Sequence, residues 1–493
     1  MMPRPAAPCA ASVTPLGRRW ENAPVPPIVE ADATTLAQRI AAGEISAREA
    51  VNACLDQIAG IDSSLHAFVD VRAADALAEA RAFDDAAARG APTLPLGGVP
   101  VTVKSALEVR GLRCETGSPS RLGVRATSDA VVVQRLRAAG AIVLGTTNVA
   151  EMLMGYETVN PLHGTTHNPW DLARTPGGSS GGESAAIAAG CSFAGIGSDG
   201  GGSIRVPAHF TGICGLKPTP GRIPSTGHQP ACLGPFSLLG VVGPMARSVA
   251  DLRALYGVLA GWDADDPTAV PSGTGAPFPA SREVWWFESA DRAPTTTDTR
   301  AAVATAVSAL AAVGYTVRHR RPRAFDEATA LWDVFFGDAG EMLLTDALGD
   351  EARALPILAA MHRERGPRLP LTAARLAAAW AARDRVRADF IGELQGRLVV
   401  CPVTAMPAFR HGEQRWRIDG RDVGYLDAMI YTQWFNLLGA PAAVVPVGRS
   451  SEGLPIGVQI AGAPFMEADI LDAAAAIERA RGGYLAPPAG VVA

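Results

Sequence analysis

Hydrophobic patterns of helical and of strand period alternate along most of this chain. Apolar residues recur at helical spacing from about Thr35 and again after Ser46, where Ser46 and Glu49 fit a capping box. A β-like run over residues 99–103 follows and ends on Lys104. Further helices are predicted over residues 74–89, 130–139, 184–189, 299–313 and 468–480, and further strands over residues 141–144, 191–196, 283–287, 399–405 and 454–460. This alternation predicts an α/β layered fold.

The same patterns give the domain organisation. Residues 1–30 are rich in Pro and Ala and predict a flexible N-terminal extension. Residues 31–490 contain neither a repeat nor a low-complexity linker, so we expect one large domain. Within it, residues 322–395 read as a helix-rich insertion, which we expect to build much of the substrate pocket.

The net charge and the cysteine content indicate which partners and which cellular compartment to expect. The net charge of −5 over 493 residues gives no basic footprint for nucleic acid or for an acidic membrane surface. The chain lacks an apolar run near the ~20 residues that span a bilayer. The seven cysteines are odd in number and form no C-x-x-C pair, which favours reduced thiols in the cytoplasm.

Two glycine-rich loops that carry serine are the most informative local feature. The first is Gly-Gly-Ser-Ser-Gly-Gly at residues 177–182, and the second is Gly-Gly-Gly-Ser at residues 200–203. Glycine is placed where the backbone takes a positive φ or where another group approaches the main chain closely. Serines in such loops indicate nucleophilic or proton-relay chemistry beside bare backbone N–H donors.

A serine nucleophile needs a base, and the sequence offers an unusual one. None of the eight histidines lies in a catalytic pattern, and no His/Cys/Asp cluster has metal-ligand spacing, so we expect neither a metal nor another cofactor. Lys104 ends an apolar run, where burial would lower the pKa of its ammonium. The local sequence alone nevertheless favours a lysine that leaves a strand end for solvent.

The first loop also matches G-x-S-x-G, the nucleophile elbow of α/β-hydrolases. That elbow requires a strand immediately before it. Here the preceding residues include Pro169 and Pro176 within a polar segment, so a strand is not expected and Ser179 is a poor candidate for this type of nucleophile.

Several longer motifs, in order along most of the chain, resemble the amidase signature family. They are GVPVTVKS around Lys104, GTTN at 145–148, NPWD at 168–171, PGGSSGG at 176–182, GSDGGGSIRVPA at 197–208, CGLKPT at 214–219 and GLPIGVQ at 453–459. The resemblance implies a large mixed β-sheet core with helices on both faces. It also implies a Ser–cis-Ser–Lys triad, with the cis peptide bond at Gly178–Ser179.

By motif position, the resemblance makes Ser203 the nucleophile, Ser179 the bridging serine and Lys104 the base. The backbone N–H groups expected to bind the oxyanion belong to Gly200, Gly201, Gly202 and Ser203. The residues expected to support the two loops are Ser180, Asp199 and Arg205.

The function expected from these residues is an amidohydrolase that cleaves the C–N bond of aryl or alkyl amides or anilides, and also carbamates and esters, through an acyl-enzyme. The expected partners are a small-molecule amide and, as one possibility, a second copy in a homodimer, without nucleic acid or membrane. Aromatic candidates for the substrate pocket are Trp332, Phe336, Tyr431 and Trp434, although a core role fits them equally well.

Two alternatives stay open. One is the A subunit of a tRNA-dependent amidotransferase, a glutaminase that shares this signature. Its Ser-Leu-Asp stretch is replaced here by QPACLGPFSLLGVVG at residues 229–243. The other is a catalytically inactive binding protein on the same fold, against which the intact triad argues.

Overall fold

The computed structural model of the chain describes residues 28, 31–232, 236–271, 273, 275–276, 278–279, 281–349, 355–366, 370–488 and 491. The predicted N-terminal extension over residues 1–30 therefore lies, apart from residue 28, outside the described residues.

An 11-stranded mixed sheet forms the centre of the molecule, with strand order β1-β3-β2-β6-β8-β7-β14-β15-β11-β9-β10. The strands are β1 (Phe68–Val71), β2 (Pro100–Lys104), β3 (Ile142–Thr147), β6 (Ala194–Asp199), β7 (Cys214–Lys217), β8 (Val241–Ala246), β9 (Glu283–Trp286), β10 (Thr316–His319), β11 (Leu398–Pro402), β14 (Ala442–Arg449) and β15 (Pro455–Ala461). Two hairpins lie outside it, β4 (Val159–Asn160) with β5 (Gly164–Thr165) and β12 (Arg415–Ile418) with β13 (Arg421–Gly424).

Strands β2, β3 and β6 are parallel neighbours, and this arrangement positions the first half of the site. Lys104 at the end of β2 pairs with Thr147 at the end of β3, and Val103 pairs with Ile196 of β6. The carboxyl ends of parallel strands meet at one edge of a sheet, which is where ligands of α/β folds bind. Lys104 and the Ser198–Asp199 end of β6 therefore come together, although they are almost a hundred residues apart in sequence.

The sheet is buried on both faces, as the strands themselves show. Val400 of β11 and Val445 of β14 belong to one hydrophobic core, whereas their neighbours Cys401 and Val444 belong to the other. The first core packs against helices α1 (Ala33–Ala41), α2 (Ala47–Leu65), α3 (Ala73–Ala88), α4 (Val131–Ala138), α8 (Val249–Leu259), α9 (Thr297–Ala312) and α16 (Glu467–Arg481). The second packs against α6 (Arg205–Thr211), α10 (Ala324–Trp332), α12 (Pro356–Arg365), α13 (Ala373–Leu394), α14 (Tyr425–Ala428) and α15 (Ile430–Leu437). The predicted mixed sheet with helices on both faces is thus confirmed.

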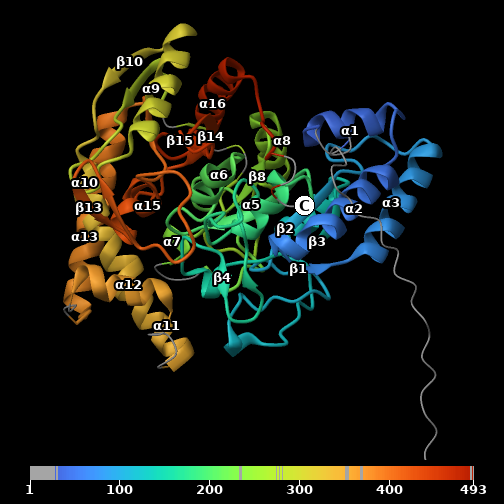
Figure 1. Ribbon diagram of the computed structural model, residues 1–493, viewed down its shortest axis with the longest axis horizontal. Helices are drawn as coiled ribbons and strands as arrows, with labels where there is room; N and C mark the ends of the chain where they lie inside the picture. The colour runs from blue at the N-terminus through green and yellow to red at the C-terminus, as the bar shows by residue number, and fades with distance from the viewer. Residues whose placement is uncertain are drawn as a thin grey trace, which may run out of the picture.

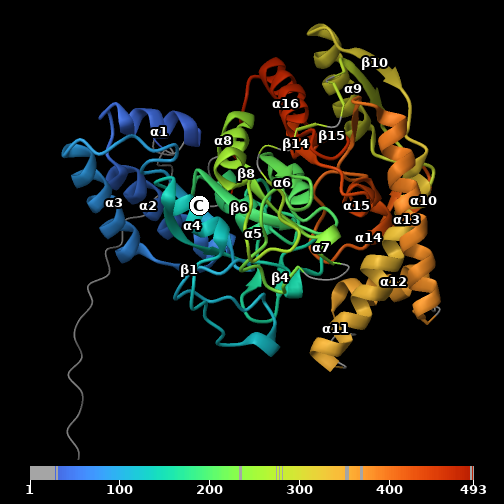
Figure 2. The same cartoon turned by 180° about the vertical axis from the view of Figure 1, so that it is seen from behind.

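The described residues of segment 322–395 lie mostly in helices. Between α10 and α11 (Gly340–Leu348), the π-helical segment Asp333–Ala339 carries Phe335 and Phe336 inward. Figures 1 and 2 show α10–α13 grouped at one end of the molecule, with α1–α3 at the opposite end. Two short helices complete the fold near the site, α5 (Gly181–Ala188) and α7 (Phe236–Leu239).

The N-caps of the first two helices can be compared with those predicted from the sequence. The predicted capping box is present at α2, where the Ser46 side chain accepts from the Glu49 amide and Glu49 accepts from the Ser46 amide. The first helix begins slightly earlier than its pattern suggests, because Asp32 rather than Thr35 is the N-cap and its carboxylate accepts from the Thr35 amide.

Ser46→Ala removes the N-cap acceptor of α2 and should lower the free energy of unfolding by about 1 kcal/mol. The matched control is Ser308→Ala, because that exposed hydroxyl only donates back to Ala304 O within α9. Thermal denaturation of both variants beside the parent protein measures the difference. An equal melting temperature for the two variants would show that the cap contributes nothing.

Candidate active site

Lys104 is fully buried, contrary to the solvent-facing position that its local sequence favours. The loop of Ser179 and the end of β6 at Ser198 surround its amine and exclude water from it. Its Nζ lies 2.7 Å from Ser179 Oγ, 3.1 Å from Ser198 Oγ and 3.3 Å from the Ser198 carbonyl oxygen. The amine therefore has three oxygen neighbours, all of them on serines.

The loop that carries Ser179 enters from irregular backbone, as expected from its two prolines, and the nucleophile-elbow geometry is absent from it. Its Gly178–Ser179 peptide bond is cis. A Cβ on Gly178 would lie 2.5 Å from the Glu157 carbonyl oxygen, so only glycine fits there. Ser180 is the N-cap residue of α5 and donates its hydroxyl to the Ser198 carbonyl, which ties this loop to the end of β6.

A buried ion pair shapes the loop that carries Ser203. The Arg205 guanidinium donates to both carboxylate oxygens of Asp199 at 3.0 Å, and both side chains are fully buried. Arg205 also donates to the Thr432 carbonyl and to Gln459 Oε1, while Asp199 accepts from the Ile204 amide. The turn between the two charges is therefore fixed from several directions.

The Gly202 amide corrects one sequence-based expectation. It donates to Asp199 Oδ1 at 2.7 Å, so it is engaged away from any oxyanion. The Gly201 carbonyl, in turn, accepts from Tyr156 Oη at 3.1 Å and from Thr432 Oγ1 at 2.7 Å, which orients the preceding turn. The N–H groups left as candidate oxyanion donors are those of Gly200, Gly201 and Ser203.

Burial sets the ionisation of the site. Desolvation lowers the pKa of Lys104 from 10.5 to about 7, against the opposing attraction of Asp199. The Asp199 carboxyl is also desolvated, but the Arg205 charge and hydrogen bonds outweigh this and hold its pKa well below the usual range. Burial raises the pKa of Glu183 to about 7, although Thr102 and Thr147 both donate to its carboxylate.

A cavity of about 310 Å³ opens onto both serines. Its polar lining includes Ser179, Ser198, Gly200, Ser203 and His228. The apolar part of its lining consists of Met152, Leu153, Met154, Pro230, Ala231, Phe336, Leu343 and Leu344. The arrangement can hold an acyl group against a serine hydroxyl, with a buried amine behind the neighbouring serine.

The four aromatic pocket candidates divide into two groups. Phe336 lines the cavity, and Trp332 stacks on it at 4.4 Å while also packing behind Gly201. Tyr431 and Trp434 lie in the core instead. The Tyr431 hydroxyl bonds to the Ala290 amide and the Ala293 carbonyl, and Trp434 is fully buried among Phe325, Phe390 and Phe435. The expected pocket role of these two residues was wrong, because α15 turns them away from the cavity.

Sequence reasoning missed several lining residues. Met152 and Leu153 both have a positive φ, of 48° and 63°, in a short turn after β3 that no sequence pattern announces. Leu343 and Leu344 come from α11 in the predicted insertion. His228 carries no motif, and only the fold brings it beside Ser198.

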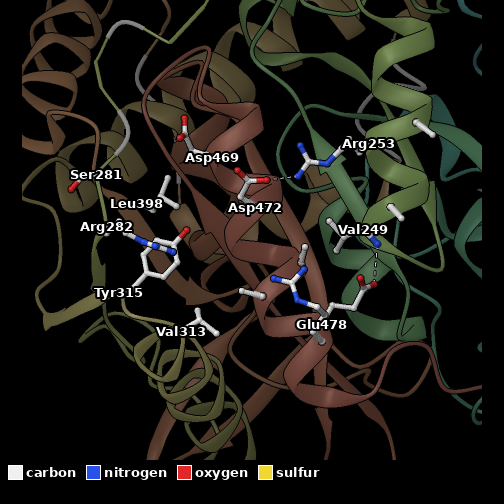
Figure 3. Close-up of a pocket in the computed structure, with 15 residues that line it drawn as sticks. Val249, Arg253, Ser281, Arg282, Val313, Tyr315, Leu398, Asp469, Asp472 and Glu478 are labelled. Atoms are coloured by element: carbon white, nitrogen blue, oxygen red, sulfur yellow. Dashed lines mark hydrogen bonds and ion pairs between the residues drawn. The ribbon is translucent and has the colours of Figure 1, made fainter.

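A larger groove of about 880 Å³ lies elsewhere, and its lining shares no residue with that of the serine cavity. Figure 3 shows side chains of α8 and α16 along this groove, among them Val249, Arg253, Asp469, Asp472 and Glu478. Arg253 pairs with Asp472, and Glu478 accepts from the Val249 amide. The groove contains none of the serine, lysine or glycine groups described above.

The sheet, the two loops and the buried lysine define a serine hydrolase site of the amidase type, and the comparison with known proteins agrees. Residues 49–471 match the family described as Amidase, and the chain belongs to this amidase signature family. One relative is the A subunit of the glutamyl-tRNA(Gln) amidotransferase of Oleidesulfovibrio alaskensis, which is 35% identical over 90% of this chain and 96% of its own length.

Two solved structures are also similar to this chain. One comes from work on a vestigial protein complex that reveals the evolutionary origins of an s-triazine catabolic enzyme; its TM-score is 0.83 at 31% identity, over 93% of this chain and all of the other. The other is 6-aminohexanoate cyclic dimer hydrolase complexed with substrate, with a TM-score of 0.79 at 28% identity, over 94% of this chain and all of the other.

The expectation about partners was wrong. It had a small-molecule amide as the chain's one partner besides a possible second copy, and it excluded nucleic acid. The curated relative is instead named as one subunit of a larger enzyme, and that enzyme is named for an aminoacylated tRNA. Net charge describes the surface of one chain, so it does not exclude an assembly in which another subunit contacts an RNA. As for membranes, the described part of the chain contains no helix long and apolar enough to cross one.

Asp199→Asn should lower the free energy of unfolding by about 3–5 kcal/mol, because it leaves the Arg205 charge buried without a counter-ion. Asp472→Asn is the control, since it breaks an ion pair with Arg253 whose partners are exposed, and it should cost less than about 1 kcal/mol. Urea unfolding followed by circular dichroism compares the two. Similar losses would mean that the buried pair does not hold the loop.

Proposed function

We propose that the chain cleaves a carboxamide through an acyl-enzyme on Ser203, and that it does so as the ammonia-releasing A-type subunit of an amidotransferase. The similarity to the A subunit of a glutamyl-tRNA(Gln) amidotransferase, along nearly the full length of both chains, carries this proposal. Glutamine is then the substrate of this subunit. The proposal also places the chain in the cytoplasm, where an enzyme that acts on a charged tRNA works.

The proposed chemistry uses Lys104 as the base. Neutral Lys104 accepts a proton from Ser179 while Ser179 accepts one from Ser203, whose oxygen attacks the amide carbon. The amides of Gly200, Gly201 and Ser203 donate to the oxyanion that forms, and each is worth roughly 3–4 kcal/mol. The relay then returns the proton to the leaving nitrogen, and water releases the acyl group from Ser203. The 2.7 Å contact between Lys104 and Ser179 supports the first transfer.

A second candidate is an amidase for an amide with an apolar acyl group, and the cavity lining favours it. Among the described residues that line the cavity, Asp199 carries the one full charge, and Arg205 already neutralises it. The ammonium and carboxylate of glutamine would need charged or polar partners there. We propose that the 322–395 segment, which contributes Phe336, Leu343 and Leu344, sets the choice of acyl group.

Ammonia release distinguishes the two candidates. The chain is purified from its own cells, so that any partner subunit stays bound, and is assayed with glutamine and with hexanamide. The first proposal predicts ammonia from glutamine that disappears in Ser203→Ala and persists in Ser308→Ala, whose hydroxyl is exposed on α9. Release from hexanamide with none from glutamine would exclude it and support the second candidate. If Ser203→Ala keeps either activity, Ser203 is not the nucleophile.

The rate should also depend on pH through Lys104. Below its pKa of about 7 the amine is protonated and cannot accept a proton, so kcat/KM should fall as the pH drops through about 7 and level off above it. Glu183→Gln is the control, because burial raises the pKa of Glu183 to about 7 as well. If Lys104 causes the fall in kcat/KM at low pH, that fall should persist in this variant. A profile that is flat between about pH 5 and about pH 9 would contradict a lysine base.

A further inference from the structure

His228 lies in the cavity wall, two hydrogen bonds away from Lys104 and three from Ser179. Its Nε2 is 2.9 Å from Ser198 Oγ, and Ser198 Oγ is 3.1 Å from Lys104 Nζ. Ser198 is the penultimate residue of β6, whereas His228 follows the turn at residues 226–227 and precedes the cis bond Gln229–Pro230. Residues from three separate segments thus form one chain that ends on Ser179.

The direction of every bond in this chain follows from one carbonyl. His228 Nδ1 is 2.8 Å from the Pro230 carbonyl oxygen, and a carbonyl oxygen only accepts. Nδ1 therefore carries the proton of the neutral imidazole, and Nε2 has a free electron pair. Ser198 must donate its hydroxyl proton to that electron pair.

Because its proton is donated to His228, Ser198 Oγ can only accept a hydrogen bond from Lys104. A neutral amine has two N–H donors and one electron pair, and three oxygens surround Lys104. The carbonyl and hydroxyl oxygens of Ser198 take the two N–H donors. The remaining electron pair of Lys104 then points at Ser179, which is the orientation that a base needs.

We propose that His228 is a positioning residue that acts through Ser198 to turn the electron pair of Lys104 toward Ser179. This inference rests on the proposed triad and adds a member to it. An imidazolium would reverse the chain, because Nε2–H would donate to Ser198 and Ser198 would donate to Lys104. Burial prevents this by lowering the pKa of His228 to about 4, and the positive charge of Lys104 acts in the same direction.

A residue that merely fills the cavity wall would also slow the enzyme when it is replaced, so a single variant is not sufficient. The two roles differ in their coupling to Ser198. If His228 acts only through Ser198, its loss costs nothing more once the Ser198 hydroxyl is gone. If it acts by packing, the two losses multiply.

The rate at which a fluorophosphonate probe labels Ser203 tests the proposal, because labelling needs an activated serine but no amide substrate. His228→Leu and Ser198→Ala should each slow labelling about 10- to 100-fold, and the double variant should be no slower than the slower single one. His228→Gln, which keeps an acceptor, and Ser198→Thr, which keeps the hydroxyl, should recover most of the rate. His319→Leu on β10 is the matched control and should label like the parent protein, since this histidine is exposed and pairs with Glu288.

Losses that multiply in the double variant, or parental labelling of His228→Leu, would overturn the proposal. If His228→Leu fails to fold, the labelling rates of Ser198→Ala, Ser198→Thr and His228→Gln test the proposal instead. Slow labelling of both Ser198→Thr and His228→Gln would contradict the proposal. Labelling that occurs without ammonia release from any amide would sink the proposed function while leaving this test intact. A parent protein that is not labelled at all would remove the triad, and this inference with it.

Discussion

The contact between a desolvated Lys104 amine and Ser179 Oγ is the interaction on which the rest of the site depends. In water a lysine is charged and has no electron pair to offer. Complete burial removes hydration from the ammonium and brings the pKa to about 7, so that the neutral base is populated near neutral pH. The neighbouring residues keep Lys104 dry and direct its electron pair, and the Asp199–Arg205 pair holds the loop of Ser203 in place.

The fold supplies this environment with its strand order. Placing β2 between β3 and β6 closes the end of the strand on both sides and brings Ser198 to the amine. The Asp199–Arg205 pair then turns the chain sharply, so that Ser203 and the amides beside it face the cavity that Ser179 also lines. A buried ion pair contributes little net stability, but in this place it fixes a loop whose glycines would otherwise be free to move.

Much of this could be predicted from sequence, and for identifiable reasons. The capping box of α2, the alternating strands and the glycine loops follow from local rules, and the order of several long motifs pointed to Lys104, Ser179 and Ser203. The burial of Lys104 could not be predicted, because it depends on neighbours at residues 147 and 196. Tyr431 and Trp434 were misassigned since aromatic residues look alike in sequence whether they face a core or a cavity. His228 was passed over because its role depends on the Pro230 carbonyl and on Ser198, neither of which marks a motif.

The lysine content of the chain allows a direct measurement of the central claim. The sequence contains only two lysines, Lys104 and Lys217, so isotope labelling of lysine gives two side-chain signals, and Lys217→Arg assigns them. Nuclear magnetic resonance titration of the Lys104 Nζ and Cε signals reports its protonation without any substrate. The account predicts a midpoint near pH 7. A Lys104 that stays protonated up to its ordinary pKa of 10.5 would contradict it.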